Sequence, residues 1–185
     1  MSAQIEPRRF NVTEYYKMAK AGILKPDDRV ELIEGEIIKM SPIGSPHAAC
    51  VSRLSRLFHK LDEAAVMVSI QNPVRLDDYS EPVADVALLR PRKDFYGARH
   101  PLPKDTLLVV EVADSTLLKD RNVKVPLYAR KGICEVWLVN IPKEIVEVYF
   151  DLRAEKYRCQ KFKRRDVVKS ISVKGLALKV NDILG

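Results

Sequence analysis

Two acidic residues interrupt apolar runs of the kind that form buried strands. Asp85 opens the segment DVALL, and Glu111 stands inside TLLVVEVA, residues 106–113. A buried carboxylate is costly unless it has a charged partner or binds a metal ion. Two acids on neighbouring strands could converge on one hard cation, and Mg²⁺ is typically held by one or two carboxylates together with substrate phosphate. The structural alternative is that each acid pairs with a nearby arginine or lysine, or lies at a strand end in water.

A basic residue, Lys124, lies in the predicted helix that directly follows the Glu111 strand, so its side chain could reach back over the strand end. Two acids and a lysine around a phosphate form a coherent hydrolytic site. The acids would hold the cation, which stabilises developing negative charge and activates water. The lysine would offer a point charge that orients the attacking water. Alternatively, Lys124 is one of 32 basic residues and lies on a solvated helix face.

Helices and strands alternate irregularly along the chain, which predicts a mixed α/β fold. Asn11 and Glu14 fit a capping box for a first helix that ends near Gly22, and Ser45 and Pro46 fit the start of a second helix. A third helix over 119–131 contains Pro126, which predicts a kink or a late start. A hairpin is expected over 29–40, turning at Glu34-Gly35, and strands over 66–71, 73–77, 84–90, 106–113, 134–140, 145–151, 157–163 and 167–172.

Length and composition fit one globular domain, residues 1–185, with 46% hydrophobic and 31% charged residues. No apolar run approaches the roughly 18–20 residues of a membrane helix, and the opening MSAQIEPRRF lacks the apolar core of a signal peptide. We therefore expect a cytoplasmic protein without membrane association. The three cysteines (Cys50, Cys134 and Cys159) form no CxxC pair, and we expect buried free thiols.

The net charge of +7 is concentrated near the C-terminal end of the chain. Residues 152–185 hold ten lysines and arginines against three acids. This basic end is either an electrostatic footprint for phosphate or a solvated strand surface that aids solubility. Its candidate substrate-binding residues are Lys161, Lys163, Arg164 and Arg165.

Several segments, in this order, carry a family resemblance. EPVADVALL is followed about 25 residues later by LLVVEVADST and then by DRNVKVPLYARKGICEVWLVN, with RVELIEGEIIKMSPIGSPH near the start and VNDIL near the end. Together they cover roughly residues 10–184. The chain resembles the Uma-type family of putative restriction endonucleases within the PD-(D/E)XK nuclease superfamily. The resemblance implies a restriction-endonuclease-like core, a mixed central sheet flanked by helices, here with a β-rich C-terminal extension.

The resemblance also assigns the catalytic residues. The superfamily's two acids fall on Asp85 and Glu111, as catalytic residues and metal ligands. Its lysine ordinarily lies two residues after the second acid, where this chain has Ala113. In Uma-type sequences the lysine has moved into the next helix, which implies Lys124. Ala84 also replaces the usual proline before the first acid, a change that removes no ligand.

A further acid often accompanies this superfamily's site, and Glu31 is the candidate, with Glu34 weaker because it fits turn chemistry. His47 matches the family pattern in the first turn of the second helix. It could contact a phosphate or polarise water, or it could simply pack at the helix start. Tyr128 and Trp137 match family aromatics and are expected in the core. A polar stretch is expected to cap the third helix, or alternatively to contact the metal ligands from outside: Asp114, Ser115, Thr116 and Asp120.

These features favour an endonuclease that depends on Mg²⁺, with Mn²⁺ as a substitute, and hydrolyses duplex DNA. Enzymes of this type often act as homodimers, and edge strands in the β-rich end could supply the interface. The alternative is a catalytically weak or inactive nuclease-fold protein that binds DNA or regulates, because Ala113 stands at the usual lysine position. An enzyme of smaller phosphoesters is less favoured, because the seven glycines form no phosphate loop.

Overall fold

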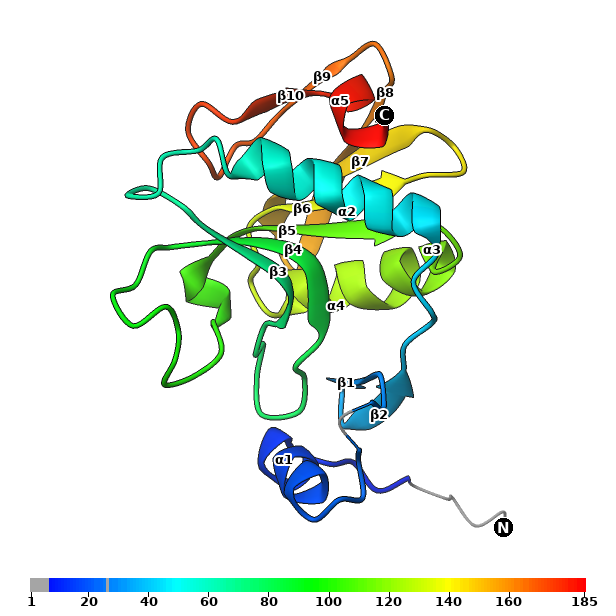
Figure 1. Ribbon diagram of the computed structural model, residues 1–185, viewed down its shortest axis with the longest axis vertical. Coiled ribbons are helices and arrows are strands. Elements are labelled where there is room, and N and C mark those ends of the chain that lie inside the picture. Colours follow the sequence, from blue (N-terminus) through cyan, green and yellow to red (C-terminus); the bar gives the residue numbers. More distant parts are fainter. Residues whose placement is uncertain (1–6, 26) are drawn as a thin grey trace.

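The computed structural model describes residues 7–25 and 27–185, and within them six strands form one mixed sheet (Figure 1). The strand order is β3-β4-β5-β6-β7-β8, and only the β5–β6 pair is parallel. A parallel pair needs a crossover connection, and the crossover between these two strands contains Lys124. The strands are β3 (Met67–Pro73), β4 (Val83–Leu89), β5 (Thr106–Ala113), β6 (Val136–Asn140), β7 (Ile145–Arg153) and β8 (Lys156–Lys163).

Helices cover both faces of this sheet (Figure 1). α2 (Ser45–Phe58) lies on one face, with the short α5 (Val180–Leu184) and the hairpin of β9 (Val167–Lys169) and β10 (Ala177–Lys179) beside it. α4 (Val125–Arg130) lies on the other face. These layers confirm the predicted mixed sheet flanked by helices.

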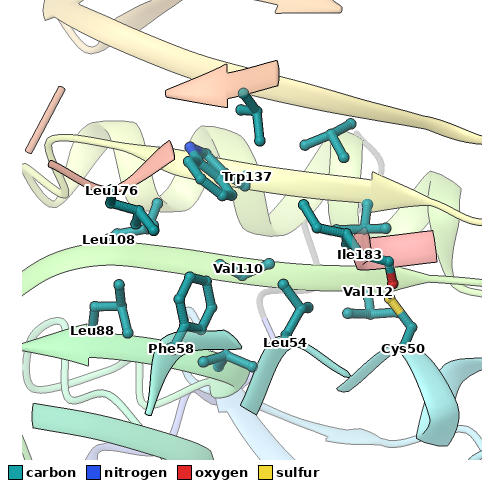
Figure 2. Packing of buried hydrophobic residues seen from close by; sticks show 14 of the residues in the cluster. Cys50, Leu54, Phe58, Leu88, Leu108, Val110, Val112, Trp137, Leu176 and Ile183 are labelled. Atoms are coloured by element: carbon teal, nitrogen blue, oxygen red, sulfur yellow. Dashed lines mark hydrogen bonds between the residues drawn. The ribbon is translucent and has the colours of Figure 1, made fainter. Parts of the chain in front are cut away.

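The main core forms where α2 packs on the sheet. Its residues Cys50, Leu54 and Phe58 recur at helical spacing and are fully buried. Figure 2 shows them against strand residues such as Val110 and Trp137. Trp137 is thus in the core, as expected. The apolar run of β5 is buried on both faces, which leaves Glu111 as an acid in an otherwise apolar strand.

The N-terminal elements are α1 (Val12–Lys20) and the hairpin of β1 (Val30–Ile33) and β2 (Glu36–Lys39). The predicted capping box is present, since the Asn11 side chain accepts from the Glu14 N–H and the Glu14 carboxylate accepts from the Asn11 N–H. The hairpin turns at Gly35, where φ is +81° and an added Cβ would come within 2.5 Å of the Arg9 Cβ. This position requires glycine for both backbone conformation and space.

Several predicted details were wrong. Residues 73–77 form no strand beyond Pro73, because the chain leaves the sheet there and bends at 77–79 before β4. The N-cap of α2 is Gly44 instead of Ser45. Cys50 is a buried free thiol, but Cys134 and Cys159 are exposed. In the ranges that the structure describes, no helix combines the length and apolar character that crossing a membrane demands.

Candidate active site

The crossover from β5 to β6 contains an unusual helical segment. It begins with α3 (Leu117–Lys119), continues through a π-helical segment, η2 (Asp120–Lys124), and ends in α4. Pro126 has no N–H to donate to the carbonyl four residues earlier, so regular α-helical bonding cannot run through this turn. This accounts for the late start of α4 that the proline predicted. Such π segments are common at functional sites.

A small pocket of about 70 Å³ lies beside this segment, between the start of β4, the end of β5, the β1–β2 hairpin and the first turn of α2. Five predicted site residues line it, although they come from five different elements. Its charged and titratable lining residues are Arg29, Glu31, His47, Asp85, Glu111, Asp114, Lys119, Asp120 and Lys124.

Lys124 and Glu111 form the buried ion pair at the base of the pocket. The Lys124 ammonium lies 3.1 and 3.3 Å from the two Glu111 oxygens and donates to the Val83 carbonyl at 2.7 Å. Burial raises the pKa of Glu111 to about 8, against the opposing effect of Lys124, and the nearby Asp85 charge raises it further. Burial lowers the pKa of Lys124, but the surrounding carboxylates outweigh burial and raise it, so the lysine stays charged.

Asp85 lines the same pocket, and both its oxygens are engaged. Oδ2 accepts from the Val112 N–H at 2.8 Å, which ties β4 to β5. Oδ1 lies 3.1 Å from Nε2 of His47, and this hydrogen bond raises the pKa of the histidine against the opposing effect of burial. The other ring nitrogen, Nδ1, is buried and has no hydrogen-bond partner among the described residues. His47 thus lines the pocket and contacts Asp85 within it.

Glu31 joins the N-terminal hairpin to the site. It is 1% exposed, and its Oε1 lies 2.5 Å from the Lys119 ammonium. Its Oε2 accepts from the Val83 N–H at 3.1 Å and lies 3.4 Å from the Lys124 ammonium. Burial raises the pKa of Glu31, but the two lysines outweigh it and hold the pKa below 4.5. Glu34, the weaker candidate, instead pairs with Arg130 outside the pocket.

Asp120 corrects one expectation from the sequence. It was expected to cap the third helix, but the N-cap residue is Thr116, whose side chain makes no capping bond. Asp120 instead turns into the pocket, is 4% exposed and accepts a hydrogen bond from the Thr116 hydroxyl at 2.5 Å. Burial raises its pKa, although Lys124 opposes the shift. Four carboxyl groups, those of Glu31, Asp85, Glu111 and Asp120, thus interact electrostatically with one ammonium.

Sequence reasoning missed a hydrogen-bonding role for Tyr128. The residue is fully buried in the core, as expected, but its hydroxyl donates to Oε1 of Glu111 at 2.6 Å.

A second acid, Glu147, was also missed. It is 1% exposed and receives two hydrogen bonds from Arg121, at 2.5 and 3.1 Å. Glu147 interrupts the apolar run IVEVYFD, which is the same signal that pointed to Glu111.

The basic residues predicted to bind substrate lie on and after the edge strand β8. Lys161, Lys163 and Arg165 are exposed. Arg164 is half-buried and holds the Glu144 carboxylate and the Asn181 side chain, so it has structural partners. Lys161 lies opposite Glu147 of β7 in the sheet register. Lys161 is therefore three strands away from Glu111, or roughly 14 Å at ordinary strand spacing.

The donor chemistry of the pocket suits a hard divalent ion with a small set of protein ligands. Among the described residues, no group of three or more histidine, cysteine, aspartate or glutamate side chains is arranged to hold a metal ion. Asp85 and Glu111 nevertheless offer carboxylate oxygens to one pocket. Two carboxylates fit Mg²⁺, which keeps several waters and uses substrate phosphate for further ligands.

The comparisons with known proteins agree with this fold. The family model "Uma2: Putative restriction endonuclease" matches residues 12–181, which confirms the resemblance drawn from the motifs. The chain is also similar to a crystal structure of a putative nuclease belonging to DUF820 from Anabaena variabilis. That similarity has a TM-score of 0.72 at 16% identity, over 96% of this chain and 98% of the other. At this identity it shows a shared fold alone. No curated protein matches the chain.

Proposed function

We propose that this chain, which belongs to the Uma2 family, is a single-domain endonuclease that depends on a divalent metal and hydrolyses phosphodiester bonds of DNA. The observation that carries the proposal is the meeting of Asp85, Glu111 and Lys124 in one pocket, from two strands and a π-helical turn. Strongly shifted pKa values in a pocket, such as that of Glu111, are typical of functional sites.

Asp85 and Glu111 would hold Mg²⁺, with Mn²⁺ as a substitute. A bound divalent ion would neutralise phosphate charge and lower the pKa of a water bound to it. The Val112 N–H and His47 hold the Asp85 carboxylate in a fixed orientation, which would favour binding of such an ion. Glu111 is buried beside the charges of Asp85 and Asp120, and an added cation would relieve this repulsion.

Lys124 is the proposed residue that orients the attacking water. Its ammonium has three N–H donors. They contact the Val83 carbonyl, Glu111 and Glu31, and the Glu31 contact is the longest, at 3.4 Å. We infer that the Glu31 contact is the one exchanged for water or a substrate oxygen. Glu31 would then act by positioning Lys124 and Lys119, since its carboxylate contacts both ammonium groups.

DNA would approach from the exposed side of the pocket. His47 lines the pocket beside Asp85 and is proposed to contact the substrate phosphate or a water beside it. Lys161, Lys163 and Arg165 are proposed to bind backbone phosphates farther along the duplex, because they are exposed cations at the sheet edge. Arg164 is proposed to contribute through its positive charge while it keeps its protein partners.

Nicking of supercoiled plasmid DNA tests the proposal. Cleavage by the wild-type protein should require Mg²⁺ or Mn²⁺ and stop with EDTA. The double variant Asp85→Asn, Glu111→Gln should lose activity by on the order of 100-fold or more. Glu147→Gln is the matched control, because it removes a buried acid on the same face of the sheet but outside the pocket. Equal cleavage by the double variant and the wild type would rule out this site.

A catalytically weak protein that binds DNA or regulates is the second candidate. It is favoured by Ala113 at the usual lysine position and by the Lys124 ammonium, which already has three protein partners. This candidate predicts salt-sensitive DNA binding without turnover, since phosphate contacts release counterions. Cleavage that co-purifies with the protein and disappears in the double variant would exclude it.

A homodimer and a cytoplasmic location are also proposed for this protein. The edge strand β8 carries Lys156, Arg158, Lys161 and Lys163, and such charges oppose self-pairing. The other edge strand, β3, carries no charged residue and suits a homodimer contact better than the β-rich end. Light scattering would measure the assembly, and fractionation would test the cytoplasmic location.

A further inference from the structure

Glu111 is fixed by two donors of different character. Lys124 approaches both carboxylate oxygens, at 3.1 and 3.3 Å. The Tyr128 hydroxyl donates to Oε1 alone, at 2.6 Å. Tyr128 lies one helical turn after Lys124, and both it and Glu111 are nearly inaccessible to solvent. A carboxylate has about four lone-pair sites, so these contacts leave capacity on the side that lines the pocket.

The two donors differ in their effect on a cation. Lys124 competes with a cation because it carries the same charge. Tyr128 is neutral, and its hydrogen bond stabilises the ionised carboxylate without repelling a cation. The phenol also restricts rotation of the carboxylate, because Oε1 must stay within reach of a ring that is packed in the core.

A second tyrosine and glutamate provide an internal comparison. On β7, the Tyr149 hydroxyl donates to Glu147 at 2.8 Å, and Arg121 completes the cluster through two hydrogen bonds. Glu147 lies in the same sheet row as Glu111 but does not line the pocket. Its tyrosine therefore supports a satisfied ion pair, whereas Tyr128 supports a carboxylate that faces the pocket.

We propose that Tyr128 is a positioning residue for Glu111 and sets the affinity of the site for its divalent cation. This inference rests on the proposed function, because Glu111 must be a metal ligand. Partners that orient a ligand typically contribute 10–100-fold to metal affinity. Removing the Tyr128 hydroxyl should therefore weaken cation binding while the ring keeps its packing.

Isothermal titration calorimetry with Mn²⁺ tests this inference on the wild-type protein and three variants. Tyr128→Phe should raise the Kd about tenfold. Tyr149→Phe, the matched control, should leave the Kd unchanged, although it loses the same type of hydrogen bond. Asp85→Asn should abolish binding. Melting temperatures would establish that each variant is folded.

The outcomes separate the inference from the proposed function. If wild type binds Mn²⁺ and Asp85→Asn does not, but Tyr128→Phe binds as tightly as wild type or more tightly, the positioning role is wrong. Equal weakening by both phenylalanine variants would also overturn it, since general loosening would explain the result. If wild type binds no Mn²⁺, the metal site and the inference fail together.

A measurement on the folded wild-type framework covers the case in which Tyr128→Phe does not fold. With 3-fluorotyrosine incorporated at position 128 alone, the single ¹⁹F resonance should shift as Mg²⁺ is added, because the acceptor of its hydroxyl becomes a ligand. A resonance that does not move at Mg²⁺ concentrations that saturate the site would overturn the inference.

Discussion

Glu111 and Glu147 lie in one row across the central sheet, on the same face and separated by Leu138. Each is buried, and each contacts a basic residue of η2, Lys124 for Glu111 and Arg121 for Glu147. Arg121 satisfies both oxygens of Glu147 with a planar two-nitrogen contact. Glu111 has the more compact ammonium and also faces the pocket. The Arg121–Glu147 pair is therefore structural, and the Lys124–Glu111 pair is suited to exchange a partner.

Replacing Lys124 with methionine should separate catalysis from cation binding. Cleavage should fall by on the order of 100-fold or more, because the charge beside the attacking water is lost. Mn²⁺ binding should persist, because lysine repels the cation and is not a ligand. The variant should lose about 3 kcal/mol of unfolding free energy, since Glu111 loses its buried partner. Plasmid nicking, calorimetry and denaturant unfolding measure the three effects.

Lys131→Met is the control for that substitution. Lys131 pairs with Asp77 outside the pocket, so its removal should leave cleavage and Mn²⁺ binding unchanged. Full cleavage activity in Lys124→Met would remove the lysine from the mechanism.

Cation binding should depend on pH through Glu111. Burial raises the pKa of this carboxyl to about 8, so protonation of Glu111 competes with the Lys124 ion pair and with a bound cation as pH falls towards 6. Binding requires the ionised form, and the proton must leave. The Mn²⁺ affinity should therefore increase as pH rises from 6 towards 8 and level off above that range. Calorimetry in buffers of different ionisation enthalpy would count the released proton. An affinity that is flat between pH 6 and 8 would contradict this prediction.

Glu147 should contribute stability that disappears in acid. Burial raises its pKa, but hydrogen bonds from Arg121 and Tyr149 outweigh burial and hold the pKa below 4.5. A carboxyl with a depressed folded pKa stabilises the protein above its unfolded pKa, and this contribution falls as pH drops through the folded value. Glu147→Gln should cost ~2 kcal/mol at pH 7, and the difference from wild type should shrink below pH 4.5. A difference independent of pH would exclude this ion pair as its source.

Elements with local signals could be predicted from the sequence. The Asn11 capping box, the turn at Gly35 and the buried strand around Glu111 each depend on residues close together in the chain. The family motifs pointed to Asp85 and Lys124, and the pocket contains both.

Contacts set by tertiary packing could not be predicted in the same way. Asp120 stands in a polar stretch, which favours helix capping, and only the π-helical turn directs it into the pocket. An acid in an apolar strand indicates a buried partner, but the same pattern fits Glu111 and Glu147. The identity of the partner depends on which side chains the crossover brings over each strand.

Glu135 is another buried acid, outside the pocket, and its role should be structural. Its Oε1 accepts from the Trp137 indole at 2.7 Å, and its Oε2 accepts from the Ser170 hydroxyl at 2.7 Å and the Ser172 N–H at 2.9 Å. These bonds tie the segment between β9 and β10 to the central sheet. Glu135→Gln should cost about 2–4 kcal/mol of unfolding free energy, because an amide nitrogen cannot accept and buried donors lose their partner.

The only tryptophan, Trp137, reports this change directly through its fluorescence. Hydrogen exchange in residues 170–176 should also accelerate, since the segment loses its anchor. Glu144→Gln, which removes an exposed acid, should leave both measurements nearly unchanged. Mn²⁺ binding should survive in Glu135→Gln, because Glu135 does not line the pocket. Loss of Mn²⁺ binding in a folded Glu135→Gln protein would mean that the two regions are coupled and that the role is not purely structural.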